Sequence, residues 1–319
     1  MSFLFEFNCF MSLLALKKYY RSLAPLVDRR TLAQGPDWDR IFGRLAPREL
    51  EIGFGNGEYI HRASLASPER DFIGLEIAWA SVKRALRRLA EPKRNNVRLI
   101  CLPAKPALEL LFPPLSLDLI RVLFPIPWPK EAHESRRLFS GSFLNIVANR
   151  LKTDGLFYLV TDDRNLAFWT LEQSKSSGLA VTLTEKSAEL NTKYERKWSS
   201  GGQDIFYHLE GRPKAIIPES YCSLKIMHPT FLDSLEPDKY KPHGQSGLVT
   251  VIFGDFFYDP VRREGFLKTK VAEEQFVQEF FIRLAPQPDG RWKLSPAVFG
   301  QALPTEGVQT ALNLAACPK

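Results

Sequence analysis

Three glycines at alternate positions follow an acidic residue in the segment Glu51-Ile-Gly53-Phe-Gly55-Asn-Gly57. A glycine-rich turn between a strand and a helix lets a ligand approach the backbone and meet the amide groups at the start of the helix. A second acidic residue, Glu76, comes 19 residues after Gly57, and a carboxylate at that distance can accept both hydroxyl groups of a ribose. The two features indicate a site for a cofactor that contains a nucleoside. A purely structural turn, or the pyrophosphate turn of a dehydrogenase, is the alternative.

A second segment combines prolines, an aromatic ring and positive charge. It runs Phe124-Pro-Ile-Pro-Trp-Pro-Lys130 and is followed by Arg136-Arg137. The prolines keep the chain extended, Trp128 offers a flat face for stacking, and the lysine and the arginines place positive charge beside it. This combination suits a nucleotide base and its phosphates. A proline-stiffened loop with a buried tryptophan and a solvated basic helix is the alternative.

Alternating strands and helices are predicted to position both segments. Buried strands are predicted over residues 48–52, 71–77, 97–102, 117–123 and 155–161. Helices are predicted over residues 57–66, 81–90 and 135–150, the last ending at the Lys-Thr-Asp-Gly sequence of residues 152–155. Such alternation is typical of an α/β fold in which a mostly parallel sheet is covered by helices on both faces. Ligands bind at the carboxyl ends of such strands, so we expect both segments at that edge.

The pattern changes after residue 212. Residues 213–245 are rich in proline and polar side chains and are interpreted as a linker. Strands are then predicted over residues 248–258, 265–271, 278–285 and 291–294, and a helix over residues 307–316. The sequence therefore predicts three parts: an N-terminal basic arm (1–47), the α/β domain (48–212), and a linker with a small β-rich C-terminal extension (213–319).

The formal net charge of the 319-residue chain is +7. Residues 213–319 contain 12 basic and 12 acidic side chains, so the whole excess lies in residues 1–212. One stretch is strongly basic and contains Lys83, Arg84, Arg87, Arg88, Lys93, Arg94 and Arg98. We expect these cations to face outward, opposite the apolar stripe of a helix, and to follow a phosphate backbone. Lys17, Lys18, Arg21, Arg29 and Arg30 are expected to form a flexible arm that folds onto RNA.

The composition also excludes several kinds of site. The four cysteines form no CxxC pair and the five histidines form no HExxH motif. We therefore expect a reduced, cytoplasmic protein without a structural metal or a disulfide framework. The apolar amino terminus contains Glu6 and is too short to cross a bilayer, and no later stretch is long enough, so no membrane span is expected. A signal peptide is a weakly supported interpretation of this segment, and a true start at Met11 instead of Met1 is at least as well supported.

Four motifs together resemble those of the bacterial tRNA (guanine-N7-)-methyltransferases in order and spacing. They are Glu51–Gly57, the Phe124–Lys130 segment with Arg136-Arg137, Thr161-Asp162, and Thr192-Lys-Tyr-Glu195. The resemblance covers residues 40–212. It implies a class I S-adenosylmethionine-dependent methyltransferase, with a Rossmann-like fold, that methylates N7 of a guanine in the variable loop of tRNA. A monomer or a homodimer is expected.

The resemblance also implies roles for individual residues. S-adenosylmethionine would be held by Glu51, Gly53, Phe54, Gly55, Asn56, Gly57, Glu76 and Ile77. The guanine and its tRNA would be held by Lys130, Asp162, Thr192, Lys193, Tyr194, Glu195, Arg136 and Arg137, with Lys130 and Asp162 as the catalytic pair. Carboxylates suit this task, because they accept from the N1–H and the amino group of guanine.

Three positions depart from the family pattern. Ile126 stands where the family has an acidic residue, Pro103 where it has an aspartate after the third strand, and Asp163 where it has a tryptophan. Guanine N7 carries a lone pair in the neutral base, so its methylation requires alignment rather than removal of a proton. A tRNA-binding protein without catalytic activity is therefore one alternative, and a methyltransferase acting on a small molecule is another.

Overall fold

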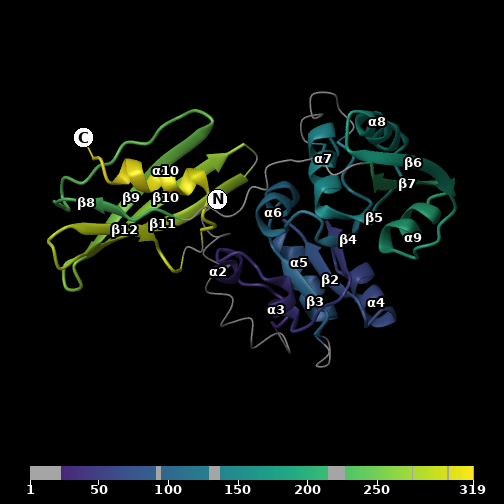
Figure 1. Cartoon of the computed structure of the whole chain (residues 1–319), viewed down its shortest axis with the longest axis horizontal. Helices are drawn as coiled ribbons and strands as arrows, with labels where there is room; N and C mark the ends of the chain where they lie inside the picture. Colours follow the sequence, from purple (N-terminus) through teal and green to yellow (C-terminus); the bar gives the residue numbers. More distant parts are fainter. Residues whose placement is uncertain are drawn as a thin grey trace. The chain divides into compact units, whose positions relative to one another are not determined.

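The computed structural model describes residues 23–90, 95–128, 137–214, 227–274, 276–299 and 302–318. The described residues divide into two compact units (Figure 1). The first contains residues 23–27 and those between 37 and 214, and the second contains residues 28–36 and those from 227 onward. Each unit has its own sheet.

The first unit is built on a seven-stranded sheet in the order β3-β2-β1-β4-β5-β7-β6. Neighbouring strands from β3 to β5 are parallel, whereas β7 is antiparallel to both β5 and β6. The α/β fold with a mostly parallel sheet is therefore as predicted, and the β6–β7 pair adds to it. The strands are β1 (Arg48–Ile52), β2 (Asp71–Leu75), β3 (Val97–Ile100), β4 (Leu117–Leu123), β5 (Leu151–Thr161), β6 (Leu179–Lys186) and β7 (Phe206–Pro213).

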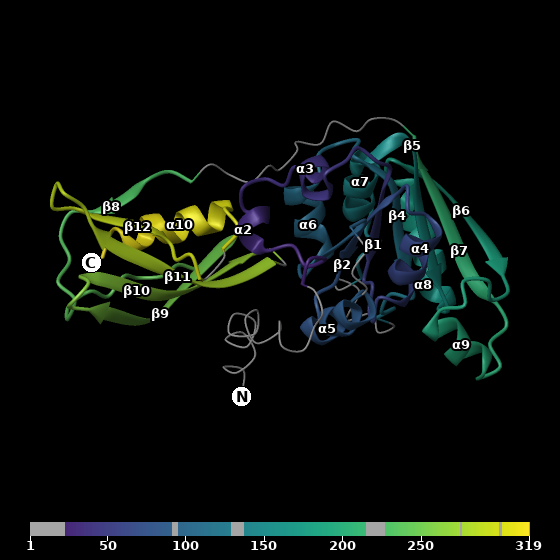
Figure 2. The ribbon, with the colours of Figure 1, turned by 90° about the horizontal axis from the view of Figure 1, so that it is seen from below.

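Helices cover this sheet in two groups. α4 packs on α5, while α7 packs on both α6 and α8, and Figure 2 shows α6 and α7 on the opposite side of the sheet from α5. The strands between them are buried on both faces, so β2 is apolar along most of its length and fully buried. The helices are α3 (Trp38–Phe42), α4 (Glu58–Ala66), α5 (Trp79–Arg88), α6 (Ala104–Leu111), α7 (Gly141–Arg150), α8 (Arg164–Lys175) and α9 (Lys193–Ser199).

Most predicted boundaries lie within two residues of the observed ones, and the two larger errors concern the starts of α7 and β5. The helix expected from residue 135 begins at Gly141, because the hydroxyl group of Ser140 accepts from the backbone N–H of Phe143 and caps it. The Lys-Thr-Asp-Gly sequence lies inside β5 instead of ending the helix. Its residues form an irregularity in the ladder, since Leu151 pairs with Leu117 and the register shifts before Leu156 pairs with Leu119.

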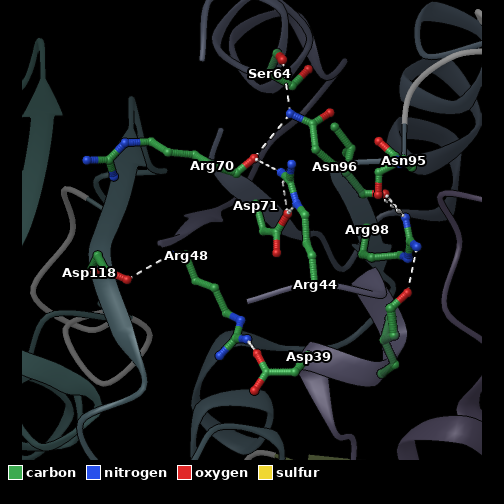
Figure 3. Close-up of polar contacts among 12 residues, drawn as sticks. Asp39, Arg44, Arg48, Ser64, Arg70, Asp71, Asn95, Asn96, Arg98 and Asp118 are labelled. Carbon is green, nitrogen blue, oxygen red and sulfur yellow. Dashed lines mark hydrogen bonds and ion pairs between the residues drawn. The ribbon is translucent and has the colours of Figure 1, made fainter. Parts of the chain in front are cut away.

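Hydrogen bonds and ion pairs of polar side chains connect the elements at the edge of the sheet where the parallel strands begin (Figure 3). Asp71, the fully buried first residue of β2, accepts from Nε of Arg44 at 2.8 Å. Asp118 near the start of β4 accepts from the backbone N–H of Arg48 at 2.8 Å. A buried, paired carboxylate of this kind holds elements in place, and the carboxyl ends of the strands remain for ligands.

Arg98 belongs to the same edge. Its guanidinium donates to the carbonyl oxygen of Ile41 at 2.7 Å and lies 4.8 Å from the centre of the Phe42 ring. The prediction that Arg98 faces outward with the other cations is therefore wrong, because Arg98 lies in β3 and not on the preceding helix. Lys93 and Arg94 lie outside the described residues.

The second unit is an antiparallel sheet in the order β8-β12-β11-β10-β9, with helix α10 packed on it. Its predicted turn is confirmed, since Gln287 and Arg291 pair across Gly290, which has a φ of 88°. Part of the predicted linker is wrong, because β8 pairs with β12. The elements are α2 (Arg29–Leu32), β8 (Thr230–Leu232), β9 (Val249–Asp259), β10 (Glu264–Glu273), β11 (Phe276–Pro286), β12 (Trp292–Pro296) and α10 (Glu306–Ala315).

Part of the predicted flexible arm is helical. Arg29 and Arg30 form the first turn of α2, which Asp28 caps, and the carboxylate of Asp28 also pairs with Arg30 at 3.1 Å. The expectation of flexibility is therefore wrong for these two residues. Lys17, Lys18 and Arg21 lie outside the described residues.

Candidate active site

The glycine turn connects β1 to α4. Gly53, Gly55 and Gly57 have positive φ angles of 74°, 55° and 72°, which side chains with a Cβ rarely adopt. A Cβ added at Gly53 would have no heavy atom within 4 Å, whereas one at Gly57 would lie 2.6 Å from Cβ of Ala85. The first glycine therefore leaves the turn open, and the third lets α4 pack closely against α5.

Phe54 and Asn56 shape the turn itself. Phe54 is 3% exposed and lies in the core beneath the turn. The side-chain oxygen of Asn56 accepts from the backbone N–H of Glu58 at 3.1 Å, and its carbonyl oxygen accepts from Nε of Arg88 at 3.3 Å. Both predicted cofactor residues are thus placed in the turn, with Phe54 turned inward.

Glu76 follows β2 and joins the turn to the next helix. Its carboxylate accepts three backbone N–H groups, from Gly55 at 3.0 Å and from Ile77 and Ala78 at 2.9 Å each. A carboxylate offers about four lone-pair sites, so the group can still accept from a ligand. The residue is partly exposed, which leaves it accessible beside the open glycines.

Glu51 is the buried carboxylate of the site. It is 4% exposed, and its Oε2 has no hydrogen-bond partner among the described residues. Burial, reinforced by the charge of Glu49, raises the pKa of Glu51 to about 8. A buried carboxylate oxygen without a partner is costly. A cationic ligand would supply the missing partner and hold the group ionised.

The third strand contributes no carboxylate. Leu102 is 2% exposed and Pro103 is extended, with φ −62° and ψ 148°, at the start of α6. The apolar surface nearby comes from Ile77, whose side chain is 70% exposed directly after Glu76. Ile77 and Glu76 therefore place an apolar and a polar group side by side at the end of β2.

The proline-rich segment follows β4 and contains two strained residues. Phe124 and Trp128 have positive φ angles of 54° and 45°, although neither is glycine. Strain of this kind gathers at functional sites. Ile126 between them is 69% exposed, so the position at which the resemblance implies an acidic residue faces solvent.

The C-terminal end of this segment lies partly outside the described residues. Arg137 donates to the carbonyl oxygen of Trp128 at 3.3 Å, and its guanidinium lies 5.2 Å from the centre of the Trp169 ring. Lys130 and Arg136, both predicted to bind substrate, lie outside the described residues.

The Thr192–Glu195 segment has two buried and two exposed side chains. Thr192 and Glu195 are buried and form the capping box of α9. The Glu195 carboxylate also accepts the backbone N–H groups of Glu189 and Leu190, at 3.1 and 3.0 Å. Lys193 is exposed, and Tyr194, 43% exposed, stacks on Phe124 at 5.9 Å between ring centres. Tertiary structure thus brings this segment against the proline-rich segment.

The same segment is tied to the cofactor helix α4. Arg196 pairs with Glu58, the first residue of α4, at 2.7 Å. Arg62 of α4 donates to the carbonyl oxygen of Leu190 at 2.6 Å. These contacts hold the segment at a fixed place relative to the glycine turn.

Asp162 and Asp163 follow β5 and differ in role. Asp163 caps α8 by accepting from the backbone N–H of Leu166 at 2.6 Å. The carboxylate of Asp162 does not cap α8. Burial raises the pKa of Asp162 above the ordinary value for aspartate. Asp162 is therefore the acid available at this strand end.

A row of buried polar groups, which the sequence analysis did not identify, crosses the sheet on the same face as Glu51. Arg121 in β4 pairs with Glu49 at 2.8 Å and lies between two tyrosine rings, 4.7 Å from Tyr59 and 4.8 Å from Tyr158. The Tyr158 hydroxyl lies 2.6 Å from Nδ1 of His208, whose pKa burial lowers. The sequence signal that could have identified this row is Arg121 itself, an arginine inside the otherwise mainly apolar strand sequence LDLIRVL.

Helix α5 bears its cations on the outer side as predicted. Val82, Ala85 and Leu86 are buried, whereas Arg84, Arg87 and Arg88 are exposed. Because Arg88 reaches the carbonyl oxygen of Asn56, this basic surface adjoins the glycine turn.

The described residues contain neither a cluster of metal ligands nor a helix that could span a membrane. No three His, Cys, Asp or Glu side chains come together in them as a metal site would require. No helix within the described ranges has the length and apolar character to cross a membrane.

Comparison with known families gives one match over half of the chain. A family model described as "Putative methyltransferase" matches residues 46–208. This range contains the glycine turn, the proline-rich segment, Asp162 and the Thr192–Glu195 segment, so the described site falls within it.

Three curated relatives are named "tRNA (guanine-N(7)-)-methyltransferase". The protein of Thermotoga maritima is 33% identical over 81% of this chain and 84% of its own length. That of Thermus thermophilus is 32% identical over 87% of this chain and 90% of its own length. That of Chlorobium phaeobacteroides is 37% identical over 50% of this chain and 79% of its own length. The first two similarities are too long to end within the first unit, so they include part of the second.

Proposed function

The chain belongs to the tRNA (guanine-N(7)-)-methyltransferase family, and from that premise we propose that it transfers a methyl group from S-adenosylmethionine to N7 of a guanine in tRNA. The structure supports this function most directly through the pairing of an open glycine turn with Glu51 and Glu76. The alternative, a tRNA-binding protein without catalysis, rests on the departures at Ile126, Pro103 and Asp163, whereas the relatives compared are all named as methyltransferases.

The residues at the cofactor end fit S-adenosylmethionine. When bound, this cofactor supplies an electrophilic methyl group on a positively charged sulfonium. Glu51 offers the cationic methionine part a carboxylate oxygen that no described residue contacts by a hydrogen bond, and Glu76 offers its remaining acceptor capacity to the ribose hydroxyls. The exposed side chain of Ile77 supplies apolar surface for the adenine.

Asp162 and the neighbouring aromatic groups would position the guanine. Methylation gives the base a positive charge, so a carboxylate at its edge stabilises the transition state more than the ground state. The raised pKa of Asp162 reflects its burial, and the carboxylate can accept from the N1–H and amino groups of guanine. Tyr194 on Phe124 offers a stacking face. Lys193 and Arg137 are proposed phosphate contacts, and Lys130 and Arg136 complete the predicted set.

Thr192 and Glu195 would contribute mainly by holding this segment in shape. Both Glu195 oxygens accept backbone N–H groups, so a direct contact with guanine would use lone pairs that remain. A role of Glu195 in guanine recognition stays a prediction.

Labelled methyl transfer tests the function directly. Purified protein is incubated with an unmodified tRNA transcript and methyl-labelled S-adenosylmethionine, and the nucleosides are then separated and identified by mass. We expect label in 7-methylguanosine, at a guanine of the variable loop. Intact tRNA binding without label in 7-methylguanosine would contradict the proposal. Because its substrate is tRNA, we expect the protein in the cytoplasm. We expect it to be a monomer or a homodimer.

A further inference from the structure

Two buried carboxylates lie on one face of β1. Glu49 and Glu51 are two residues apart on this strand and are each 4% exposed, so their side chains point to the same side of the sheet. Neighbouring buried carboxylates oppose each other's ionisation unless a cation accompanies them. The cation beside them therefore decides which carboxylate is left for a positively charged ligand.

Arg121 of β4 is committed to Glu49. It is the register partner of Glu51, yet its Nε donates to Oε1 of Glu49 at 2.8 Å. The same oxygen accepts from the hydroxyl group of Tyr59 in α4 at 2.8 Å. The Tyr59 and Tyr158 rings, with centres 4.7 and 4.8 Å from the guanidinium carbon, hold Arg121 in this direction. Glu49 thus has both a cation and a hydroxyl donor.

Glu51 lacks a comparable set of partners among the described residues. Its Oε2 is buried and has no hydrogen-bond partner in the part of the chain that the structure describes. Burial, then the charge of Glu49 and more weakly that of Glu76, raise the pKa of Glu51. Arg121 and a hydrogen bond from the backbone of Ile60 act in the opposite direction and only partly offset these effects. Glu51 is therefore the carboxylate that a cationic ligand would stabilise, and it lies at the end of β1 that leads into the glycine turn.

We propose that Arg121 is a positioning residue of the cofactor site: it neutralises Glu49 and so leaves Glu51 to bind the cationic methionine part of S-adenosylmethionine. In this role Arg121 acts through the two carboxylates and not by contact with the cofactor. Without its charge, Glu49 and Glu51 would share a proton, as close carboxylate pairs do, and that proton would compete with the cofactor. The inference rests on the proposed function, because it concerns the same cofactor carboxylate.

Removal of the Arg121 charge tests this role. Arg121→Met keeps a long side chain between the two tyrosine rings. We expect it to bind S-adenosylmethionine about tenfold more weakly than the wild type at pH 7 and about twofold more weakly at pH 9, because the shared proton is held at pH 7 and is largely lost at pH 9. Calorimetric titration at the two pH values gives both ratios. The amino group of the cofactor titrates alike in every sample, so its effect cancels from each ratio.

A second substitution distinguishes charge from packing. Arg121→Met combined with Glu49→Gln removes the second carboxylate as well as the cation, and we expect its affinity at pH 7 to return to within about threefold of the wild type. Arg44→Met is the matched control, because Arg44 also pairs with a buried carboxylate, that of Asp71, at the opposite edge of the sheet. This control should leave the affinity for S-adenosylmethionine unchanged. Thermal unfolding of each variant verifies that it is folded.

The results support or overturn this role in distinct ways. The same affinity ratio at both pH values, a double variant that binds as weakly as Arg121→Met, or an equal loss in Arg44→Met would overturn it, while 7-methylguanosine formation by the wild type would still stand. If Arg121→Met does not fold, the double variant decides: affinity within about threefold of the wild type supports the role, and binding weaker by about tenfold or more overturns it. A wild type that does not bind S-adenosylmethionine would contradict the proposed function itself, and this role with it.

Discussion

Glu51 is buried, and one of its carboxylate oxygens has no hydrogen-bond partner in the part of the chain that the structure describes. Its contribution to cofactor binding can be measured separately from catalysis. Glu51→Gln keeps the size of the side chain and removes the charge. We expect the affinity for S-adenosylmethionine to fall about 10- to 100-fold, because a hydrogen bond to a charged group is worth about 1.5–3 kcal/mol. Calorimetric titration measures this change. Glu172→Gln, on the exposed surface of α8, is the control, and an unchanged cofactor affinity in Glu51→Gln would exclude the proposed contact.

The same residue predicts a pH dependence of stability. The pKa of Glu51 is about 8 in the folded protein and 4.5 in the reference state, so the folded state holds the proton more tightly between these values. Its stabilising contribution is complete below pH 4.5 and is lost as the pH rises through 8. Relative to Glu51→Gln, the wild type should therefore lose up to about 5 kcal/mol of unfolding free energy across this range. Urea unfolding at pH 5, 7 and 9 measures the difference, and a constant difference would contradict the prediction.

Tyr194 offers a test of substrate stacking. Its ring is 43% exposed and rests on Phe124. We expect Tyr194→Ala to raise KM for tRNA about tenfold, and Tyr194→Phe to keep KM near the wild-type value, because stacking on one base is worth about 1–3 kcal/mol. Steady-state methyl transfer gives KM and kcat separately. Equal effects of both substitutions would point to the hydroxyl group rather than the ring.

At the scale of elements, Gly57 decides how closely α4 approaches α5. Gly57→Ala introduces a Cβ 2.6 Å from Cβ of Ala85, at a φ of 72°. We expect a loss of about 2–4 kcal/mol of unfolding free energy from overpacking and backbone strain. Adding Ala85→Gly should recover part of this loss by making room. Urea unfolding of the single and double variants measures both, and complete additivity of the two changes would argue against the contact.

The opposite edge of the sheet is predicted to serve stability alone. Asp71→Ala leaves Arg44 without its buried partner, which should cost about 3 kcal/mol of unfolding free energy. Glu172→Ala at an exposed ion pair should cost less than about 0.5 kcal/mol. The affinity of the folded Asp71→Ala protein for S-adenosylmethionine should match the wild type. A selective loss of that affinity would show that this edge acts on the site.

At the scale of the whole molecule, the basic surface of α5 should set the salt dependence of tRNA binding. Arg84 and Arg87 are exposed on this helix. We expect Arg84→Gln with Arg87→Gln to lower the slope of log K against log salt by about 1.5, because each phosphate contact contributes about 0.7–0.9. Lys239→Gln, at a side chain 80% exposed in the second unit, should leave the slope unchanged. Equal slopes in all three proteins would exclude α5 as a phosphate contact.

Local sequence pattern predicted the main architecture of both units. Strand and helix periodicity depends on neighbouring residues, so β1 and β4 were predicted with the bounds that the structure gives, and the turn at Gly290 was identified from its composition. The helices α6, α8 and α9 were not predicted, and neither were the strands β6, β7 and β8. The pairing of these strands depends on partners far along the chain, which the periodicity of one segment does not reveal.

The glycine turn, its two carboxylates and the outward cations of α5 could all be predicted from residue type and spacing, because neighbouring residues specify each of them. The direction in which other side chains point depends on packing between distant elements. In the folded chain Arg98 donates to the carbonyl oxygen of Ile41, Glu195 belongs to the capping box of α9, and Arg121 lies between two tyrosine rings. A buried polar group lies where distant elements supply its partner, and these elements come together only when the strands, helices and loops pack in the folded chain.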